Sequence, residues 1–416
     1  WEQRKLPEFV TFFNGLTYTP DDVEETGTLV LRSSNVKNGE IVDADNVYVN
    51  DKVVTSENVQ EGDIIVVVRN GSRALIGKHA QIKASMPNTV IGAFMSGMRS
   101  EHSSFVNALL DTSAFENEIA KNMGATINQI TGYMFSKMEF MIPSGEEQQK
   151  IGEYFQGLDH LITLHQRKLE KIKLMKKSML GKMFSRDAES IPKIRFDGYT
   201  DDWEQRKLGD ILISLQNNTL SRADLSNEAG VAKNVHYGDV LIKFGEVLDV
   251  SKEKLPMISD ESVLSKYKLS FLQNGDVIVA DTAEDSTVGK CSEIAGLNDE
   301  VVLSGLHTIP YRPIEKFASG YLGYYLNSSA YHNQLIPLMQ GIKVTSISKS
   351  AMQDTDIVYP KSVEEQGKIG DYFQSLDHLI TLHQRKQSCI CLMCITKSWE
   401  QRKLPEFVTF FNGLTY

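Results

Sequence analysis

The side chains of this 416-residue chain that are best suited to chemistry are polar and basic ones in the loops between short Val/Ile-rich runs. Arginine can bind guanine through two hydrogen bonds, asparagine binds adenine in the same way, and serine and lysine hold phosphates. These residue types predict contacts with the base edges and the backbone of DNA. Asn, Gly and Ser are also ordinary turn residues, so the same composition fits loops that bind nothing. The candidate DNA-binding residues are Arg32, Ser34, Asn35, Lys37, Arg69, Asn70, Arg73, Lys78, Asn217, Asn218, Arg222, Lys290, Lys343, Thr345 and Ser346.

No motif in the sequence supplies a reaction of its own. Gly71–His79 reads GSRALIGKH and resembles a phosphate-binding loop, but five residues instead of four separate its glycines, and histidine replaces the magnesium-binding serine or threonine. A GxGxxG turn, a GxSxG elbow and the Asn-Pro-Pro-aromatic or Asp-Pro-Pro-aromatic loop of an amino-methyltransferase are absent. Asp201, Asp202 and Glu204 fit a solvated linker better than a nuclease site. We therefore predict a non-catalytic chain that binds no cofactor itself.

The composition is that of ordinary globular material, with 41% hydrophobic and 24% charged residues. No apolar run approaches the ~20 residues that span a bilayer, so we expect no membrane contact and a cytoplasmic location. A formal net charge of −10 argues against a surface coated in phosphate-binding cations but allows a local basic groove. Cys389, Cys391 and Cys394 lie close together, but three thiols with no histidine beyond His383 make an incomplete zinc site. We predict no metal site.

Two near-identical segments must position the loops. Ser144–Lys168 reads SGEEQQKIGEYFQGLDHLITLHQRK, and Ser362–Lys386, 218 residues later, reads SVEEQGKIGDYFQSLDHLITLHQRK. A serine and two glutamates suit the start of each helix, and apolar residues then recur at alternating steps of four and three, as in a coiled coil. The obvious partner of each helix is the other one. The predicted helix-pair seam contains Ile151, Phe155, Leu158, Ile162, His165, Ile369, Phe373, Leu376, Ile380 and His383.

One histidine lies in each seam, at His165 and His383. A metal-binding or proton-transferring role is one interpretation of these residues. A polar residue at a seam position more often fixes the register of two helices, and we favour that structural interpretation.

Between the helices, residues 27–94 and 211–312 are rich in Val, Ile and Thr in short runs broken by Gly, Asn and Asp, which is typical of strands and turns. Glu61–Ile82 and Asn274–Ile294 share the order strand, irregular turn, Gly-Lys and strand. We expect an α+β fold with two mixed α/β domains separated by a pair of long antiparallel coiled-coil helices, related by a pseudo-twofold internal repeat. The expected parts are residues 1–143 (first domain), 144–190 (first long helix and linker), 191–361 (second domain), 362–398 (second long helix, shortened or altered at its end) and 399–416 (a duplicate of the N-terminal segment).

The two helix copies, each following a domain with a GDII…GK or GDVI…GK core and preceding WEQRKL, resemble the specificity subunit of type I restriction-modification systems. The resemblance covers nearly the whole chain and its order of parts. It implies two target-recognition domains, each of which reads one half of a bipartite, asymmetric DNA sequence. It also implies that the helices set the unread spacer and dock the methyltransferase subunits. Individual base-reading residues cannot be transferred from the family, because its recognition domains vary.

The resemblance places the catalytic chemistry in partner proteins. It implies double-stranded DNA as one partner, together with two modification subunits that methylate adenine with S-adenosylmethionine. It also implies two restriction subunits that use ATP and magnesium to translocate and cut DNA. An alternative from a different class is a coiled-coil adaptor whose globular ends bind proteins, which predicts no sequence-dependent affinity for DNA and little sensitivity to salt.

The chain departs from a regular repeat near its end. His165 and Trp203 are 38 residues apart, whereas His383 and Trp399 are only 16 residues apart. The sequence therefore predicts a second helix that is shorter or altered. WEQRKL occurs at Trp1, Trp203 and Trp399, and Trp399–Tyr416 repeats Trp1–Tyr18. We interpret the last copy as a duplicate that could compete for the place of the first, and not as a third recognition site.

Overall fold

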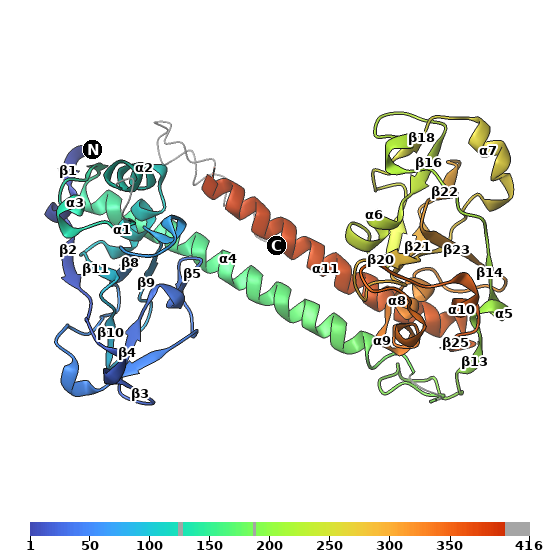
Figure 1. Ribbon diagram of the computed structural model, residues 1–416, viewed down its shortest axis with the longest axis horizontal. Helices are drawn as coiled ribbons and strands as arrows, with labels where there is room; N and C mark the ends of the chain where they lie inside the picture. The colour runs from blue at the N-terminus through green and yellow to red at the C-terminus, as the bar shows by residue number, and fades with distance from the viewer. Residues whose placement is uncertain (124–127, 186–188, 396–416) are drawn as a thin grey trace. The chain divides into compact units, whose positions relative to one another are not determined.

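The computed structural model describes residues 1–123, 128–185 and 189–395, with side chains described as far as residue 388. The chain divides into two compact units, one from Trp1 to Leu164 and one that begins at His165. Both contain helices and sheets, and helix α4 (Gly145–Leu180) runs from the first unit into the second (Figure 1). Within the described ranges, no helix has the length and apolar character needed to span a membrane.

Two four-stranded sheets form the body of the first unit. The central strand β8 (Ile64–Val67) reads IIVV, and each of its residues is at most 1% exposed, as expected for a strand covered on both faces. Phe105 of α1 (Ser103–Leu110) and Phe115 of α2 (Ser113–Asn122) belong to the same core. The first sheet has the order β2 (Thr11–Asn14), β11 (Met95–Arg99), β8 (Ile64–Val67) and β9 (His79–Gln81), and the second has the order β10 (Thr89–Ile91), β4 (Thr28–Leu31), β7 (Val47–Val49) and β3 (Val23–Glu24). The other elements are β1 (Glu2–Lys5), β5 (Val36–Lys37), β6 (Glu40–Ile41), β12 (Glu139–Ile142), α1 (Ser103–Leu110), α2 (Ser113–Asn122) and α3 (Gly132–Phe135).

The second unit also has two main sheets, and its central strand β19 (Val277–Ala280) reads VIVA without an exposed residue. One sheet has the order β14 (Leu212–Ser214), β23 (Thr308–Pro313), β19 (Val277–Ala280), β21 (Cys291–Ala295) and β17 (Val247–Asp249). The other has the order β15 (Leu225–Ser226), β18 (Met257–Ile258), β16 (Ala232–Val235) and β22 (Val302–Ser304). Strands β13 (Glu204–Lys207) and β25 (Asp356–Tyr359) form a pair, as do β20 (Thr282–Ala283) and β24 (Thr345–Ser346). The helices are α5 (Leu208–Ile211), α6 (Tyr237–Ile242), α7 (Ser262–Lys266), α8 (Tyr321–Asn327), α9 (Ser329–His332), α10 (Lys349–Gln353) and α11 (Val363–Ile395).

The two units repeat one sheet order. The antiparallel neighbours β2, β11, β8 and β9 of the first unit correspond to β14, β23, β19 and β21 of the second. The weak sequence repeat at Glu61–Ile82 and Asn274–Ile294 contains β8 with β9 and β19 with β21. In the second unit, β17 adds a fifth strand by parallel pairing with β21. The prediction of two repeated, mixed α/β domains is therefore confirmed.

Each of the first two WEQRKL copies closes its domain in the same way. Strand β1 pairs antiparallel with β12, and β13 pairs antiparallel with β25, directly before a long helix begins. The indole Nε1 of Trp1 donates a hydrogen bond to Glu147 Oε1 (3.1 Å), and that of Trp203 donates to Glu365 Oε1 (3.3 Å). Glu147 and Glu365 occupy the same position of the helix repeat. We call each strand pair, with its Trp–Glu hydrogen bond, the clamp of that domain.

The predicted seam residues have different surroundings along each helix. Ile151 belongs to the core of the first unit, and Phe155 packs against it, while Ile369, Phe373 and Leu376 belong to a core of the second unit. Farther along, the seam holds partly buried side chains, and His165 Nδ1 lies 2.9 Å from His383 Nδ1. The first turns of the seam therefore attach each helix to its own domain. Leu158 is buried, and Ile162, His165, Ile380 and His383 are partly buried.

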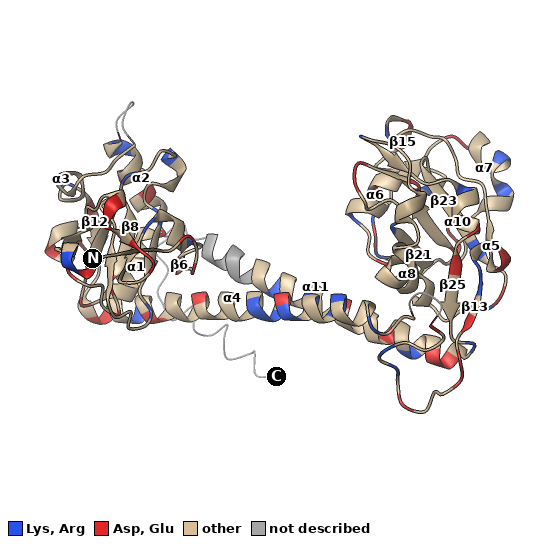
Figure 2. Cartoon of the chain, turned by 60° about the horizontal axis from the view of Figure 1, so that its bottom comes forward, with Lys and Arg blue, Asp and Glu red and all other residues tan. Residues whose placement is uncertain are grey.

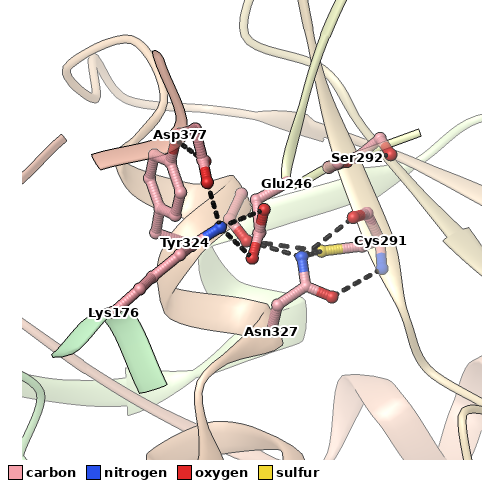
Figure 3. A network of polar contacts seen from close by, with 9 residues as sticks. Lys176, Glu246, Cys291, Ser292, Tyr324, Asn327 and Asp377 are labelled. Atoms are coloured by element: carbon pink, nitrogen blue, oxygen red, sulfur yellow. Dashed lines mark hydrogen bonds and ion pairs between the residues drawn. The ribbon is translucent and has the colours of Figure 1, made fainter. Parts of the chain in front are cut away.

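A partly buried polar network joins the end of α4 to α11 and to the sheet of the second unit (Figure 3). The ammonium of Lys176 lies 2.6 Å from Asp377 Oδ1 and 2.8 Å from Glu246 Oε2, and it lies over the ring of Tyr324. The hydroxyl of Tyr324 donates to Asp377 Oδ2 at 2.7 Å. Beside this group, Asn327 of α8 donates to the carbonyl of Cys291 at 2.8 Å. These contacts fix the register of α4 against α11 inside the second unit.

Helix α11 has 33 described residues and α4 has 36. The predicted change at the end of the second helix, and the duplicate Trp399–Tyr416, lie outside the described residues. The side chains of Cys389, Cys391 and Cys394 lie outside them as well.

Candidate nucleic-acid interface

Three loops of the first unit meet at one place. The side-chain amide of Asn70 donates to Ser33 Oγ at 3.1 Å, which joins the loop after β8 to the turn after β4. The backbone of Arg69 forms an isolated antiparallel β-bridge with Gln129 of a third loop. Arg69 is exposed, and its guanidinium lies 5.0 Å from the ring centre of Phe94, which is 55% exposed. A planar cation stacked on an exposed ring can read a base edge and contact a thymine methyl group.

Phe94 and Gln129 were not among the predicted site residues. Each lies far from the basic loop in the sequence, and only the fold brings it to Arg69. Among the predicted residues of this unit, Ser34, Lys37, Arg73 and Lys78 are exposed, as is Arg69. The guanidinium of Arg32 is engaged with Asp45 at 2.6 Å. Asn35 is 1% exposed, and its side chain caps the backbone of its own turn, so its role in this structure is structural.

An open cleft of about 480 Å³ is the corresponding feature of the second unit. Asn217 lines this cleft, and its amide donates to the carbonyl of Gly305 at 3.2 Å. The adjacent Asn218 is fully buried, and its amide donates to Asn234 Oδ1 at 2.6 Å and to the carbonyl of Ser304 at 2.9 Å. Of two neighbouring asparagines predicted to bind DNA, one therefore faces the cleft and the other supports its wall.

The other predicted residues of the second unit are dispersed. Arg222 pairs with Asp239 at 2.5 Å. Lys290 points inward and donates to the carbonyl of Leu241 at 2.7 Å, and burial lowers the pKa of its ammonium. Ser346 exchanges two backbone hydrogen bonds with Gln340 at the base of a hairpin. Lys343 is exposed at the tip of this hairpin, and Thr345 and Ser346 pair with β20.

Metal-binding side chains do not gather in the part of the chain that the structure describes: no group of three His, Cys, Asp or Glu residues lies close enough to hold an ion. Cys291 is a free cysteine in the core of the second unit, and burial raises the pKa of its thiol. A buried thiol that resists ionisation is a poor nucleophile and a poor ligand.

The comparisons with known proteins decide the family. The family model described as the type I restriction modification DNA specificity domain matches the chain twice, at residues 1–174 and 200–390. The chain belongs to this family. The MjaVIII specificity subunit of Methanocaldococcus jannaschii is 25% identical over 277 residues, which cover 65% of this chain and 63% of that protein, less than two thirds of its length. The EcoKI specificity subunit of Escherichia coli K12 is 24% identical over 391 residues, which cover 89% of this chain and 80% of that protein.

Solved structures share the fold of this specificity-family chain. The type I restriction-modification S subunit from M. genitalium matches with a TM-score of 0.58 and 12% identity, over 95% of this chain and 94% of that one. A chain from a study of complex assembly and conformational transition in a type I R-M system matches with a TM-score of 0.53 and 15% identity, over 95% of both chains. The resemblance inferred from the helix copies and WEQRKL is thus confirmed.

The two domains of this specificity-family chain differ in the loops that the repeat places at equivalent positions. The loop after β8 reads RNGSR, whereas the equivalent loop after β19 reads DTAEDS. The first presents two arginines and the second presents carboxylates, including Asp281. In Figure 2, Lys and Arg are interspersed with Asp and Glu in both units, so this contrast is local and does not reflect one basic and one acidic domain. One framework therefore carries two chemically different loops.

Proposed function

We propose that this chain is the non-catalytic DNA-reading subunit of a type I restriction-modification complex, in which each domain reads one half of a bipartite, asymmetric target. The observation that carries the proposal is the repeated sheet order with opposite loop chemistry at equivalent places. Two copies of one reader with the same loops would favour a symmetric target. Loops of different charge favour two different half-sites, because donors and acceptors on the protein select different base edges.

The parts of the chain have separate roles in this proposal. Residues 1–143 and 191–361 are the recognition domains, and residues 144–190 and 362–398 form an antiparallel coiled-coil pair that sets the unread spacer. Two contacts support the antiparallel direction: His165 lies opposite His383, and Lys176, farther along α4, lies opposite Asp377, which comes earlier in α11. The clamps attach these helices to the domains, so the distance between the readers follows from the helices.

The helices also offer a repeated surface for partners. Leu161 and Leu164 of α4, and Leu379 and Leu382 at the same repeat positions of α11, are each more than a third exposed. A leucine pair presented twice on near-identical helices suits two copies of one partner. We assign this surface to two modification subunits, which supply S-adenosylmethionine-dependent methylation. Two restriction subunits with ATP and magnesium complete the assembly, and the cytoplasmic location expected from the sequence is part of the same proposal.

Methylome sequencing tests the proposal most directly. Cells that express the chain with its modification subunit should carry adenine methylation at one bipartite motif, and the motif reports both half-sites and the spacer. Arg69→Ala should relax the motif in one half-site and leave the other unchanged. Lys52→Ala, which removes an exposed cation of the same unit outside the three loops and outside the clamp, is the control. Absence of methylation, together with equal binding of the complex to random duplexes, would overturn the proposal.

A further inference from the structure

The cleft of the second domain brings the predicted Asn217 together with side chains that the predicted site did not include. Its lining includes Gln216, Asn217, Lys266, Asp281 and Lys349, which come from four separate segments of the domain. Two of these side chains are cations, two are amides and one is a carboxylate. This combination can both hold a nucleic-acid backbone and contact base edges.

The two lysines lie on different parts of the rim. Lys266 is the last residue of α7, and its ammonium lies 5.1 Å from the ring centre of Tyr267, which is buried beneath it. Lys349 is the first residue of α10. Both are exposed, and among the described residues no carboxylate lies within 4.0 Å of either ammonium. Both ammonium groups are therefore available to contact phosphates.

The polar groups between the lysines are held in place through their backbones. The backbone N–H of Gln216 donates to Ser270 Oγ at 3.0 Å, and no described side chain binds the Gln216 amide. The backbone N–H of Asp281 donates to the carbonyl of His307, and its own carbonyl accepts from Ile347. The backbone at both positions is therefore ordered before a ligand binds, which lowers the entropic cost of binding.

Acceptors dominate this part of the cleft. Thr282 Oγ1 donates to one carboxylate oxygen of Asp281 at 2.7 Å, which orients the carboxylate and leaves the other oxygen available. The Nδ2 of Asn217 is used by the carbonyl of Gly305, which leaves the amide oxygen as its free group. In the major groove, acceptors meet the exocyclic amino groups, N4 of cytosine and N6 of adenine.

We propose that this cleft binds the DNA half-site read by the second domain, with Lys266 and Lys349 on phosphates and Asp281 and Asn217 accepting from an exocyclic amino group of cytosine or adenine. Gln216 reads the neighbouring base. This assignment rests on the proposed function and makes it more specific. The half-site of the first domain, where Arg69 and Arg73 supply donors, is then expected to present guanine acceptors.

The phosphate role is tested through salt dependence. The complex with the modification subunit is titrated with duplex DNA over a salt series, comparing Lys266→Ala/Lys349→Ala with the unaltered chain. The slope of log K against log salt is negative, and loss of two phosphate contacts should make it shallower by about 1.8. The same loss should weaken binding to all sequences alike. Lys252→Ala/Lys361→Ala removes two exposed lysines of the same domain outside the cleft and should leave the slope unchanged. Equal slopes for both double variants would refute the phosphate role.

The base-reading role is tested through the methylated motif. Asp281→Asn keeps the size of the side chain and an acceptor for Thr282 but adds an amide donor. It should reduce discrimination at one base position of one half-site by roughly 5- to 150-fold. Asp299→Asn, an exposed acid outside the cleft, should leave the motif intact. An unaltered motif, with methylation retained, would refute the role of Asp281, as would a change confined to the half-site altered by Arg69→Ala. If the unaltered chain reads no motif at all, the proposed function fails instead.

Discussion

The buried end of the second clamp gives the sharpest stability prediction. Glu365 is 1% exposed, and it accepts hydrogen bonds from Arg195 at 2.7 and 2.9 Å and from the indole of Trp203 at 3.3 Å. The Arg195 side chain is itself only 11% exposed. Glu365→Ala would leave a guanidinium with little access to water and without its partner. Breaking such a pair costs about 3–5 kcal/mol, because the remaining charge is poorly solvated.

The helix repeat supplies the matched control. Glu147 occupies the same position of the first copy, but its hydrogen bond with Trp1 lies at the surface. Glu147→Ala should therefore cost less than about 1 kcal/mol. Native-state hydrogen exchange of the full chain, followed separately in β13 and β25 and in β1 and β12, measures the opening free energy of each clamp. If the two substitutions lowered the opening free energies of their clamps by equal amounts, burial of the Arg195–Glu365 pair would not explain the loss of stability.

Two further predictions concern the long helices. His165 and His383 share one hydrogen bond at 2.9 Å, which requires a neutral imidazole as the acceptor. The pKa of His165 is lowered, first by burial and then by the opposite imidazole and two nearby lysines. Its contribution is therefore present above pH 6.5 and is lost as the pH falls through the lowered pKa. The second unit should unfold at lower urea concentration at pH 5 than at pH 7.5, and the double variant His165→Leu/His383→Leu should lack this difference. In α4, a Cβ at Gly152 would lie 2.7 Å from the backbone nitrogen of Phe105, whereas one at Gly157 meets nothing within 4 Å. Gly152→Ala should destabilise the first unit by about 1–3 kcal/mol, and Gly157→Ala should stabilise the helix by up to about 1 kcal/mol, as measured by urea unfolding.

Local patterns in the sequence were sufficient to predict the elements. The serine and glutamates before an apolar repeat predicted two long helices, which begin at Gly145 and Val363, and the weak repeat predicted strands that correspond to β8 and β19. These features depend on neighbouring residues, which the sequence displays directly. Periodicity could not identify what each apolar residue contacts. Ile151 satisfies the coiled-coil spacing, yet it packs in the core of the first unit, because one spacing serves any apolar surface.

The candidate interface was less predictable because it depends on contacts between distant segments. Asn217 and Asn218 are chemically identical neighbours, and only the positions of Asn234 and Ser304 decide that Asn218 is buried. Lys266 and Lys349 are far apart in the sequence and meet at one cleft only after the sheets have formed. Loop composition could not separate side chains that support a loop, such as Asn218, from side chains that face a cleft, such as Asn217.

The clamps explain how nearly identical segments can carry different readers. Each clamp holds together the first strand of a domain, its last strand and the start of a long helix. In both copies a glutamine side chain also connects that helix to the end of the last strand. Gln148 donates to the carbonyl of Pro143 at 2.9 Å, and Gln366 donates to the carbonyl of Pro360 at 2.8 Å. None of these residues lies in the reading loops. The basic loop after β8 and the acidic loop after β19 can therefore differ without disturbing the attachment to the helix. A chain built in this way can change what a domain reads while it keeps the position from which the domain reads it.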